Sequence, residues 1–112
     1  MPVDADALDR AFQALADPSR RSIVVRLSEG PASVSALAEP LEMSLPAVMQ
    51  HIEVLQKSGI VRSEKVGRVR TCHLEPSPMR AVEQWIAQHR QVWEGRLDAL
   101  GDVLKSTYGG EK

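Results

Sequence analysis

Residues 33–55 read SVSALAEPLEMSLPAVMQHIEVL, and this stretch decides the fold. It predicts two short helices joined by a tight turn. Ser33 and Ser44 are each placed to cap the start of a helix. Pro40 removes a backbone donor, so it should end or distort the first helix. Met43 falls in the turn, and Pro46 is tolerated in the first turn of the second helix.

Each of these helices has one apolar face. In the first, the face consists of Val34, Leu37 and Leu41; in the second, it consists of Val48, Ile52 and Leu55 at positions i, i+4 and i+7. The opposite side of the second helix is small or polar, with Pro46, Gln50, Glu53 and Lys57. A helix of this kind suits a DNA major groove. An ordinary helical hairpin with one solvated face fits these residues equally well.

The composition indicates one domain with a modest aliphatic core. The chain has 112 residues, of which 43% are hydrophobic and 4% aromatic, and its formal net charge is −1. The charge is unevenly distributed: residues 18–74 hold eight Lys or Arg against five Glu, and acidic residues dominate the first seventeen positions. Positive charge in the middle of the chain leaves nucleic acid open as a partner.

The single cysteine excludes an internal disulfide and fits a reducing cytosol. The acidic start MPVDADALDR has no apolar signal core, and no apolar run approaches the ~20 residues that span a bilayer. We therefore expect a soluble, cytoplasmic protein with no membrane partner.

Two helices are expected before the central stretch, at residues 4–16 and 19–28, with Asp17 and Pro18 at their junction. Arg20 and Arg21 lie near the start of the second helix, where cations are slightly unfavourable. Their position indicates partners elsewhere, either the acidic first helix or a phosphate.

After residue 59 the apolar period changes from 3.6 to two, which predicts a β-hairpin over residues 60–74. Gly67 at the first loop position permits a type II′ turn. Lys65, Arg68 and Arg70 lie at or beside its tip. A basic hairpin directly after a candidate recognition helix is typical of a wing that contacts the DNA backbone, although a solvated charged hairpin is the alternative.

A linker with two prolines at residues 75–78 should lead into one long helix over about residues 78–104. Its apolar stripe exceeds what so small a domain can cover, so we expect it to pair with a second copy together with the first helix. Folding back on its own domain is the alternative. The expected dimer interface comprises Leu8, Phe12, Leu15, Val82, Ile86, His89, Trp93, Leu97 and Leu100.

Three segments carry a resemblance to a known family: ALADPSRR, the run from Ser44 to His51, and LQKSGIVRSEKVGR. Over nearly the whole chain the sequence resembles the ArsR/SmtB-type winged helix-turn-helix repressors. The resemblance implies a mainly α fold with a β-hairpin wing, as one domain over residues 1–112 with its helix-turn-helix at about 33–57. It also implies a homodimer that binds inverted repeats in operator DNA.

The resemblance further implies which residues approach DNA. On the recognition helix these are Ser44, Ala47, Gln50 and His51, and on the wing they are Arg68 and Arg70. The outward face of the helix and the positive charge of the hairpin add Pro46, Met49 and Lys65 to the expected DNA-binding residues. Gln50 could pair with an adenine edge, while His51 could instead cap or pack. Leu45 and Met49 depart from the polar residues frequent at these positions. We therefore expect thymine methyl contacts and DNA shape to supply more of the readout.

The metal-sensing branch of the family matches poorly. Its Cys-x-Cys motif is replaced here by ALAEPLE, and the long helix offers His89 with Glu94 as the nearest downstream carboxylate. Alternation in a strand sends Cys72 and His73 to opposite faces, so we expect a buried cysteine and a solvated histidine. The sequence thus predicts no metal and no cofactor, with a metal-sensing repressor as the alternative.

The sequence argues against an enzyme, because it contains no Gly-rich phosphate loop, no nucleophile elbow and no zinc-protease motif. A winged helix used only to bind protein is a further alternative, against which the basic hairpin argues. The sequence does not identify the operator, the target genes or an effector.

Overall fold

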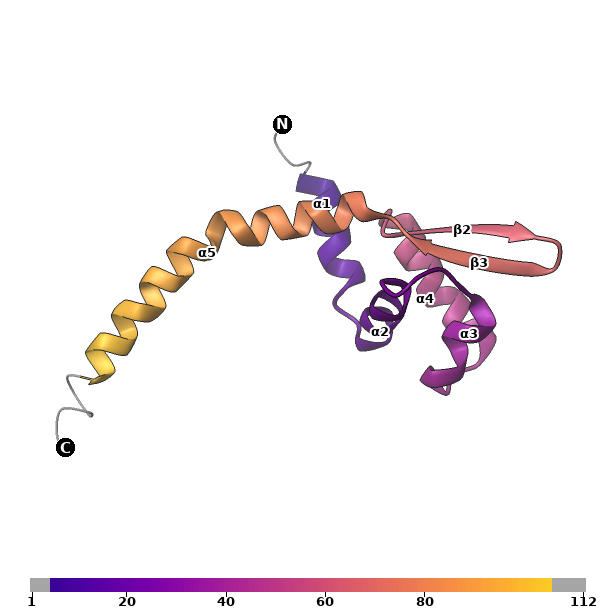
Figure 1. The fold of residues 1–112 in the computed structure, drawn as a ribbon, viewed down its shortest axis with the longest axis horizontal. Helices are drawn as coiled ribbons and strands as arrows, with labels where there is room; N and C mark the ends of the chain where they lie inside the picture. Colours follow the sequence, from indigo (N-terminus) through magenta and orange to yellow (C-terminus); the bar gives the residue numbers. More distant parts are fainter. Residues whose placement is uncertain (1–4, 106–112) are drawn as a thin grey trace. The chain divides into compact units, whose positions relative to one another are not determined.

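The computed structural model describes residues 5–105, and the chain divides after Val82 into two units. The first unit contains four helices, a short 3₁₀ turn and a small sheet, followed by the start of the last helix (Figure 1). In chain order the elements are α1 (Ala5–Ala14), α2 (Pro18–Leu27), β1 (Ala32–Ser33), α3 (Val34–Ala38), η1 (Glu39–Leu41), α4 (Leu45–Lys57), β2 (Val61–Val66), β3 (Val69–Leu74) and α5 (Pro76–Leu104).

The junction between α1 and α2 is fixed by side chains that bond to helix ends. Asp17 caps α2 by accepting hydrogen bonds from the backbone N–H groups of Ser19 at 2.8 Å and Arg20 at 3.2 Å. Arg20 Nε donates to the carbonyl of Ala14 at 2.6 Å, and Arg21 Nη1 donates to that of Leu15 at 2.9 Å. The partners of the two arginines are therefore carbonyls at the C-terminal end of α1 and just beyond it. The helix expected over residues 4–16 ends at Ala14.

The helix-turn-helix forms as the capping residues predict. Ser33 Oγ accepts from the Ala36 N–H at 3.1 Å and Ser44 Oγ accepts from the Ala47 N–H at 3.3 Å. At Pro40 the first helix gives way to the 3₁₀ turn η1. Glu42 then adopts a left-handed conformation with φ of 53° and reverses the chain toward α4.

The sheet has three antiparallel strands in the order β1–β3–β2. The expected hairpin pairs from Val61↔Leu74 to Val66↔Val69, and β1 adds the pair Ala32↔Cys72, which the sequence did not predict. Gly67 has φ of 64°, and Glu42 is the one non-glycine residue of the described chain with positive φ. Because a type I′ turn needs positive φ at both loop positions, this loop is of the predicted type II′.

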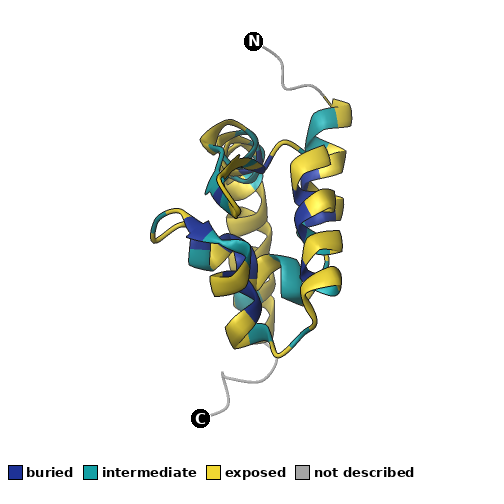
Figure 2. Ribbon diagram, turned by 90° about the vertical axis from the view of Figure 1, so that its right-hand side faces the viewer, coloured by how far each residue is buried: buried dark blue, intermediate teal, exposed yellow. Residues whose placement is uncertain are grey.

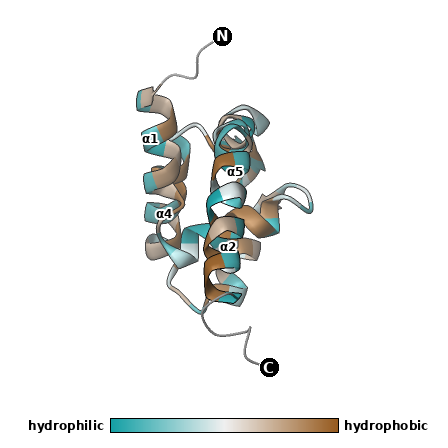
Figure 3. Cartoon of the chain, turned by 90° about the vertical axis from the view of Figure 1, so that its left-hand side faces the viewer, coloured by the Kyte–Doolittle hydropathy of each residue, from teal (hydrophilic) through white to brown (hydrophobic). Residues whose placement is uncertain are grey.

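The core of the first unit is aliphatic and joins the helices to the sheet (Figure 2). The predicted stripe of α4 is fully buried, and α1 contributes two alanines that the sequence pattern did not single out. The buried residues include Ala11, Ala14, Ile23, Val24, Leu27, Leu37, Val48, Ile52, Leu55, Ile60, Val61 and Cys72. Figure 3 shows both hydrophobic and hydrophilic residues along α1, α2 and α4.

The long helix α5 begins at Pro76, so the predicted linker over residues 75–78 is wrong beyond its first residue. Proline lacks a backbone donor, which the first helical turn does not need, so Pro76 and Pro78 start the helix instead of preventing it. The helix extends 29 residues to Leu104, as expected. Within the described residues, none of the helices is both long and apolar enough to cross a bilayer.

Candidate nucleic-acid interface

Helix α4 presents a buried face and an exposed face, which the sequence predicted. Val48, Ile52 and Leu55 each have 0% exposure and anchor the helix. Ser44, Pro46, Gln50 and the hydrophobic Leu45 and Met49 are exposed, and Ala47 is half-buried. One face of α4 therefore packs in the core, and the other face is accessible to a binding partner along the N-terminal half of the helix.

His51 lies toward α2 and is half-buried. Its Nδ1 is 3.4 Å from Nη1 of Arg20. Burial would raise the pKa of the neighbouring Asp17 carboxyl, but hydrogen bonds from the N–H groups of Arg20 and Ser19 and the charges of His51 and Arg20 lower it below its ordinary value. This geometry favours the packing role for His51 that the sequence left open, and a DNA contact by His51 stays a prediction.

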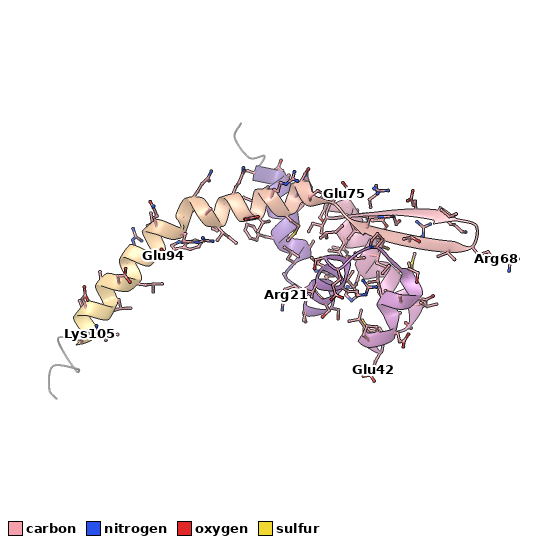
Figure 4. The ribbon with its side chains drawn as sticks, viewed as in Figure 1. Arg21, Glu42, Arg68, Glu75, Glu94 and Lys105 are labelled. Carbon is pink, nitrogen blue, oxygen red and sulfur yellow. The ribbon has the colours of Figure 1, made fainter. Side chains whose placement is uncertain are left out.

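The β2–β3 hairpin carries the basic residues of the wing. Lys65 and Arg68 are exposed, and Arg68 marks the tip of the hairpin in Figure 4. Lys65 lies directly opposite Arg70 in the sheet register. Like charges facing each other across strands are destabilising, so folding alone does not explain this pair. A polyanion that contacts the hairpin would neutralise the repulsion.

The positive charge of Arg62, on the same hairpin, is neutralised by ion pairs with two glutamates. Its Nε lies 2.9 Å from Glu75 Oε1 and its Nη1 lies 3.8 Å from Glu64 Oε2. The positive charge of the wing is therefore concentrated in Lys65, Arg68 and Arg70, the three residues that the sequence named.

A serine hydroxyl connects the recognition helix to the wing. Ser63 Oγ on β2 accepts hydrogen bonds from Gln56 Nε2 at 2.9 Å and from Arg70 Nη1 at 3.0 Å. Gln56 belongs to α4, so Ser63 holds Arg70 in a fixed direction relative to the recognition helix. No sequence pattern indicated Ser63 or Gln56, because they meet only when the hairpin folds beside α4.

The Cys72–His73 pair is divided between the faces of the sheet. Cys72 has 0% exposure, as predicted; burial raises the pKa of its thiol above the ordinary value, although the charge of Arg70 opposes the shift. The prediction of a solvated His73 is wrong. Its side chain is 24% exposed and its Nε2 lies 3.2 Å from Glu64 Oε1, because the strand register brings Glu64 diagonally across from it. No group of three His, Cys, Asp or Glu side chains within residues 5–105 is arranged to hold a metal ion.

The predicted interface residues fall on both units. In the first unit, Phe12 is 38% exposed and Leu8 and Leu15 are half-buried, whereas Val82 is buried at 8% and offers little surface. In the second unit, the His89 ring forms a cluster with Trp85 and Trp93, whose own ring centroids are 5.6 Å apart. The His89 ring centroid lies 4.5 Å from that of Trp85 and 6.0 Å from that of Trp93, and its Nδ1 lies 2.8 Å from the Trp85 carbonyl oxygen.

From Trp93 onward, the apolar side chains of the α5 stripe are exposed to solvent. Ile86 is half-buried, whereas Trp93 is 40%, Leu97 64% and Leu100 53% exposed. An exposed apolar stripe of this kind is typical of a surface that another protein chain covers. The described part of the second unit is a single helix, so this unit has no other element that could pack on the stripe.

An N-capped recognition helix, a preceding short helix and a basic hairpin define a winged helix-turn-helix domain. The family model described as a helix-turn-helix domain matches residues 15–64. The HTH-type transcriptional regulator Rv2034 of Mycobacterium tuberculosis is 46% identical over 98 residues, which cover 88% of this chain and 89% of the relative.

Two solved structures are also similar. One is an ArsR family transcriptional regulator, 51% identical with a TM-score of 0.76, and the match covers 84% of this chain and 97% of that one. The other is the homodimeric winged helix-turn-helix DNA-binding domain Mb0332 of Mycobacterium bovis, a likeness of fold at 24% identity and a TM-score of 0.64 over 78% and 83% of the two chains. The chain belongs to the ArsR family of DNA-binding transcriptional regulators, which are not enzymes.

Proposed function

We propose that the protein is a homodimeric repressor that binds an inverted-repeat operator and does not respond to metal. The proposal depends on two observations together. The N-terminal half of α4 is exposed, and Ser63 of the basic hairpin is hydrogen-bonded both to α4 and to Arg70. The N-terminal half of α4 would enter the major groove, and Lys65, Arg68 and Arg70 would contact phosphates of the adjacent backbone.

Dimerisation is supported by the exposed apolar residues on α5. Each of Trp93, Leu97 and Leu100 is at least 40% exposed, on a helix whose opposite side is polar. A similar fold is described as homodimeric in the M. bovis domain. A two-fold dimer matches a palindromic operator, because each subunit then reads one half-site.

Metal independence rests on the side chains that the described chain brings together. Cys72 is buried inside the sheet and His73 is on the other face, beside Glu64. The His89 ring packs in the cluster with Trp85 and Trp93, and its Nδ1 lies 2.8 Å from the Trp85 carbonyl oxygen. A metal-sensing repressor of the same fold is the alternative, and a winged helix that binds only protein is the lesser one.

Fluorescence anisotropy of the full chain tests the proposal. The duplexes are the DNA upstream of its own gene and a scrambled sequence of equal length, each titrated across a salt series. We expect tight, salt-dependent binding with preference for the upstream DNA, unchanged by chelator or by zinc. Release by zinc would favour the metal-sensing alternative, whereas weak, salt-insensitive binding to both duplexes would favour the protein-interaction module.

A further inference from the structure

The surface between the recognition helix and the wing contains a hollow of about 270 Å³, here called the wing–helix hollow. It is lined by the apolar residues Val34, Leu45, Met49 and Val69 and by the cationic residues Arg68 and Arg70. The hollow therefore joins the two parts of the candidate DNA-binding surface.

The apolar side chains of this hollow are exposed where a DNA-binding surface is usually polar. Leu45 is 50%, Met49 38% and Val69 52% exposed. Leu45 and Met49 are four residues apart on α4 and so lie on the same side of the helix. Their side chains contribute little to the core of this unit, whose α4 contacts come from fully buried residues.

The DNA major groove displays one apolar group, the C5-methyl of thymine. Building on the proposed operator binding, we propose that the wing–helix hollow takes up this methyl group, and that Leu45 and Met49 thereby select a thymine in each half-site. The methyl contacts the Leu45 and Met49 side chains, while Arg68 and Arg70 contact phosphates of the strand that carries it.

The two arginines distinguish this occupant from an apolar peptide or a second copy of the protein. A purely apolar partner would bury two guanidinium groups without anions, which is costly. A DNA strand carries both a methyl group and phosphates. The methyl group can therefore contact the apolar residues of the hollow while the phosphates contact the two arginines.

The test first selects duplexes that bind the full-length protein from a random pool. We expect at least one thymine required in each half-site. Deoxyuridine then replaces that thymine, which removes the methyl group and keeps the base pair. Burial of one methyl group predicts a loss of affinity of about fourfold per half-site, and about 15-fold when both half-sites are changed.

Variants of the protein assign the effect to the hollow. Met49→Ala should show a clearly smaller preference for the thymine duplex than the unmodified protein, because only the Leu45 contact with the methyl remains. Val54→Ala is a matched control, because Val54 is on the same helix, is 39% exposed against 38% for Met49, and does not line the hollow. This control should keep the full preference for thymine.

Each outcome separates this inference from the proposed function. Selection of operators with no required thymine, or equal binding of thymine and deoxyuridine duplexes by the unmodified protein, would overturn the methyl contact and leave operator binding intact. A thymine preference that is undiminished in Met49→Ala would also overturn the assignment. Failure to select any duplex would contradict operator binding itself.

Discussion

Replacement of Arg68 by alanine should remove one phosphate contact from each wing of the dimer. Arg68 is exposed at the tip of the hairpin, next to the turn at Gly67 (Figure 4). No acidic side chain in the described part of the chain forms an ion pair with it. Its charge is therefore available to DNA without a competing partner.

The size of the effect follows from counterion release. The logarithm of the association constant falls with the logarithm of salt concentration, with a slope of about −0.9 per phosphate contacted. Because the variant dimer would neutralise two phosphates fewer, the slope should become shallower by about 1.8, and the affinity ratio of unmodified protein to variant should shrink by about 12-fold between roughly 50 and 200 mM salt. The variant should bind most weakly, relative to the unmodified protein, at low salt.

Anisotropy titrations on one operator duplex across that salt range measure the slope directly. Arg62→Ala is the matched control, since Arg62 is on the same hairpin but is neutralised by Glu75 and Glu64. Its slope should stay close to that of the unmodified protein. The reasoning would be refuted by an unchanged slope for Arg68→Ala, or by an equal change in both variants.

Three further predictions concern specificity, assembly and acid stability. Gln50→Ala should relax the preference at one base pair per half-site by about 1–3 kcal/mol; equal losses on all duplexes would make Gln50 a positioning residue. Trp93→Asp should convert the dimer to monomer in sedimentation velocity, whereas Gln91→Asp, on the opposite side of α5, should not. Because hydrogen bonds and nearby positive charges lower the pKa of Asp17 in the folded state, its charge stabilises the protein above the unfolded-state pKa, and this contribution is lost as pH falls through the folded-state value. Asp17→Asn keeps a capping residue, so its unfolding midpoint should change less than that of the unmodified protein between neutral pH and about pH 3.

The sequence predicted best those features that depend on neighbours along the chain. Ser33 and Ser44 start helices because each can bond to an N–H three residues ahead. The i, i+4, i+7 spacing predicted the buried stripe of α4, and Gly67 predicted the turn of the wing. These local signals were sufficient for the winged helix-turn-helix and for the exposed residues of the recognition helix.

The features that the sequence missed depend mostly on side chains brought together from distant positions. His73 alternates outward as predicted, yet Glu64 from the partner strand lies beside it and reduces its exposure. Ser63 meets Gln56 and Arg70 only once the hairpin folds back beside α4. The linker prediction at Pro76 failed for a local reason: proline commonly breaks helices, but the first turn of a helix accepts it.

Two departures from the rules of stable folding in the first unit meet at one surface, and this supports a binding role for that surface. Lys65 faces Arg70 although like charges repel across strands. Leu45 and Met49 are exposed although apolar side chains gain free energy from burial. Both departures border the wing–helix hollow, whereas the stripe of α4 that faces the core is fully buried. A bound DNA strand would relieve both at once, since its phosphates neutralise the cations and its thymine methyl covers the apolar side chains. Local conflicts that one ligand resolves together are expected at a functional site.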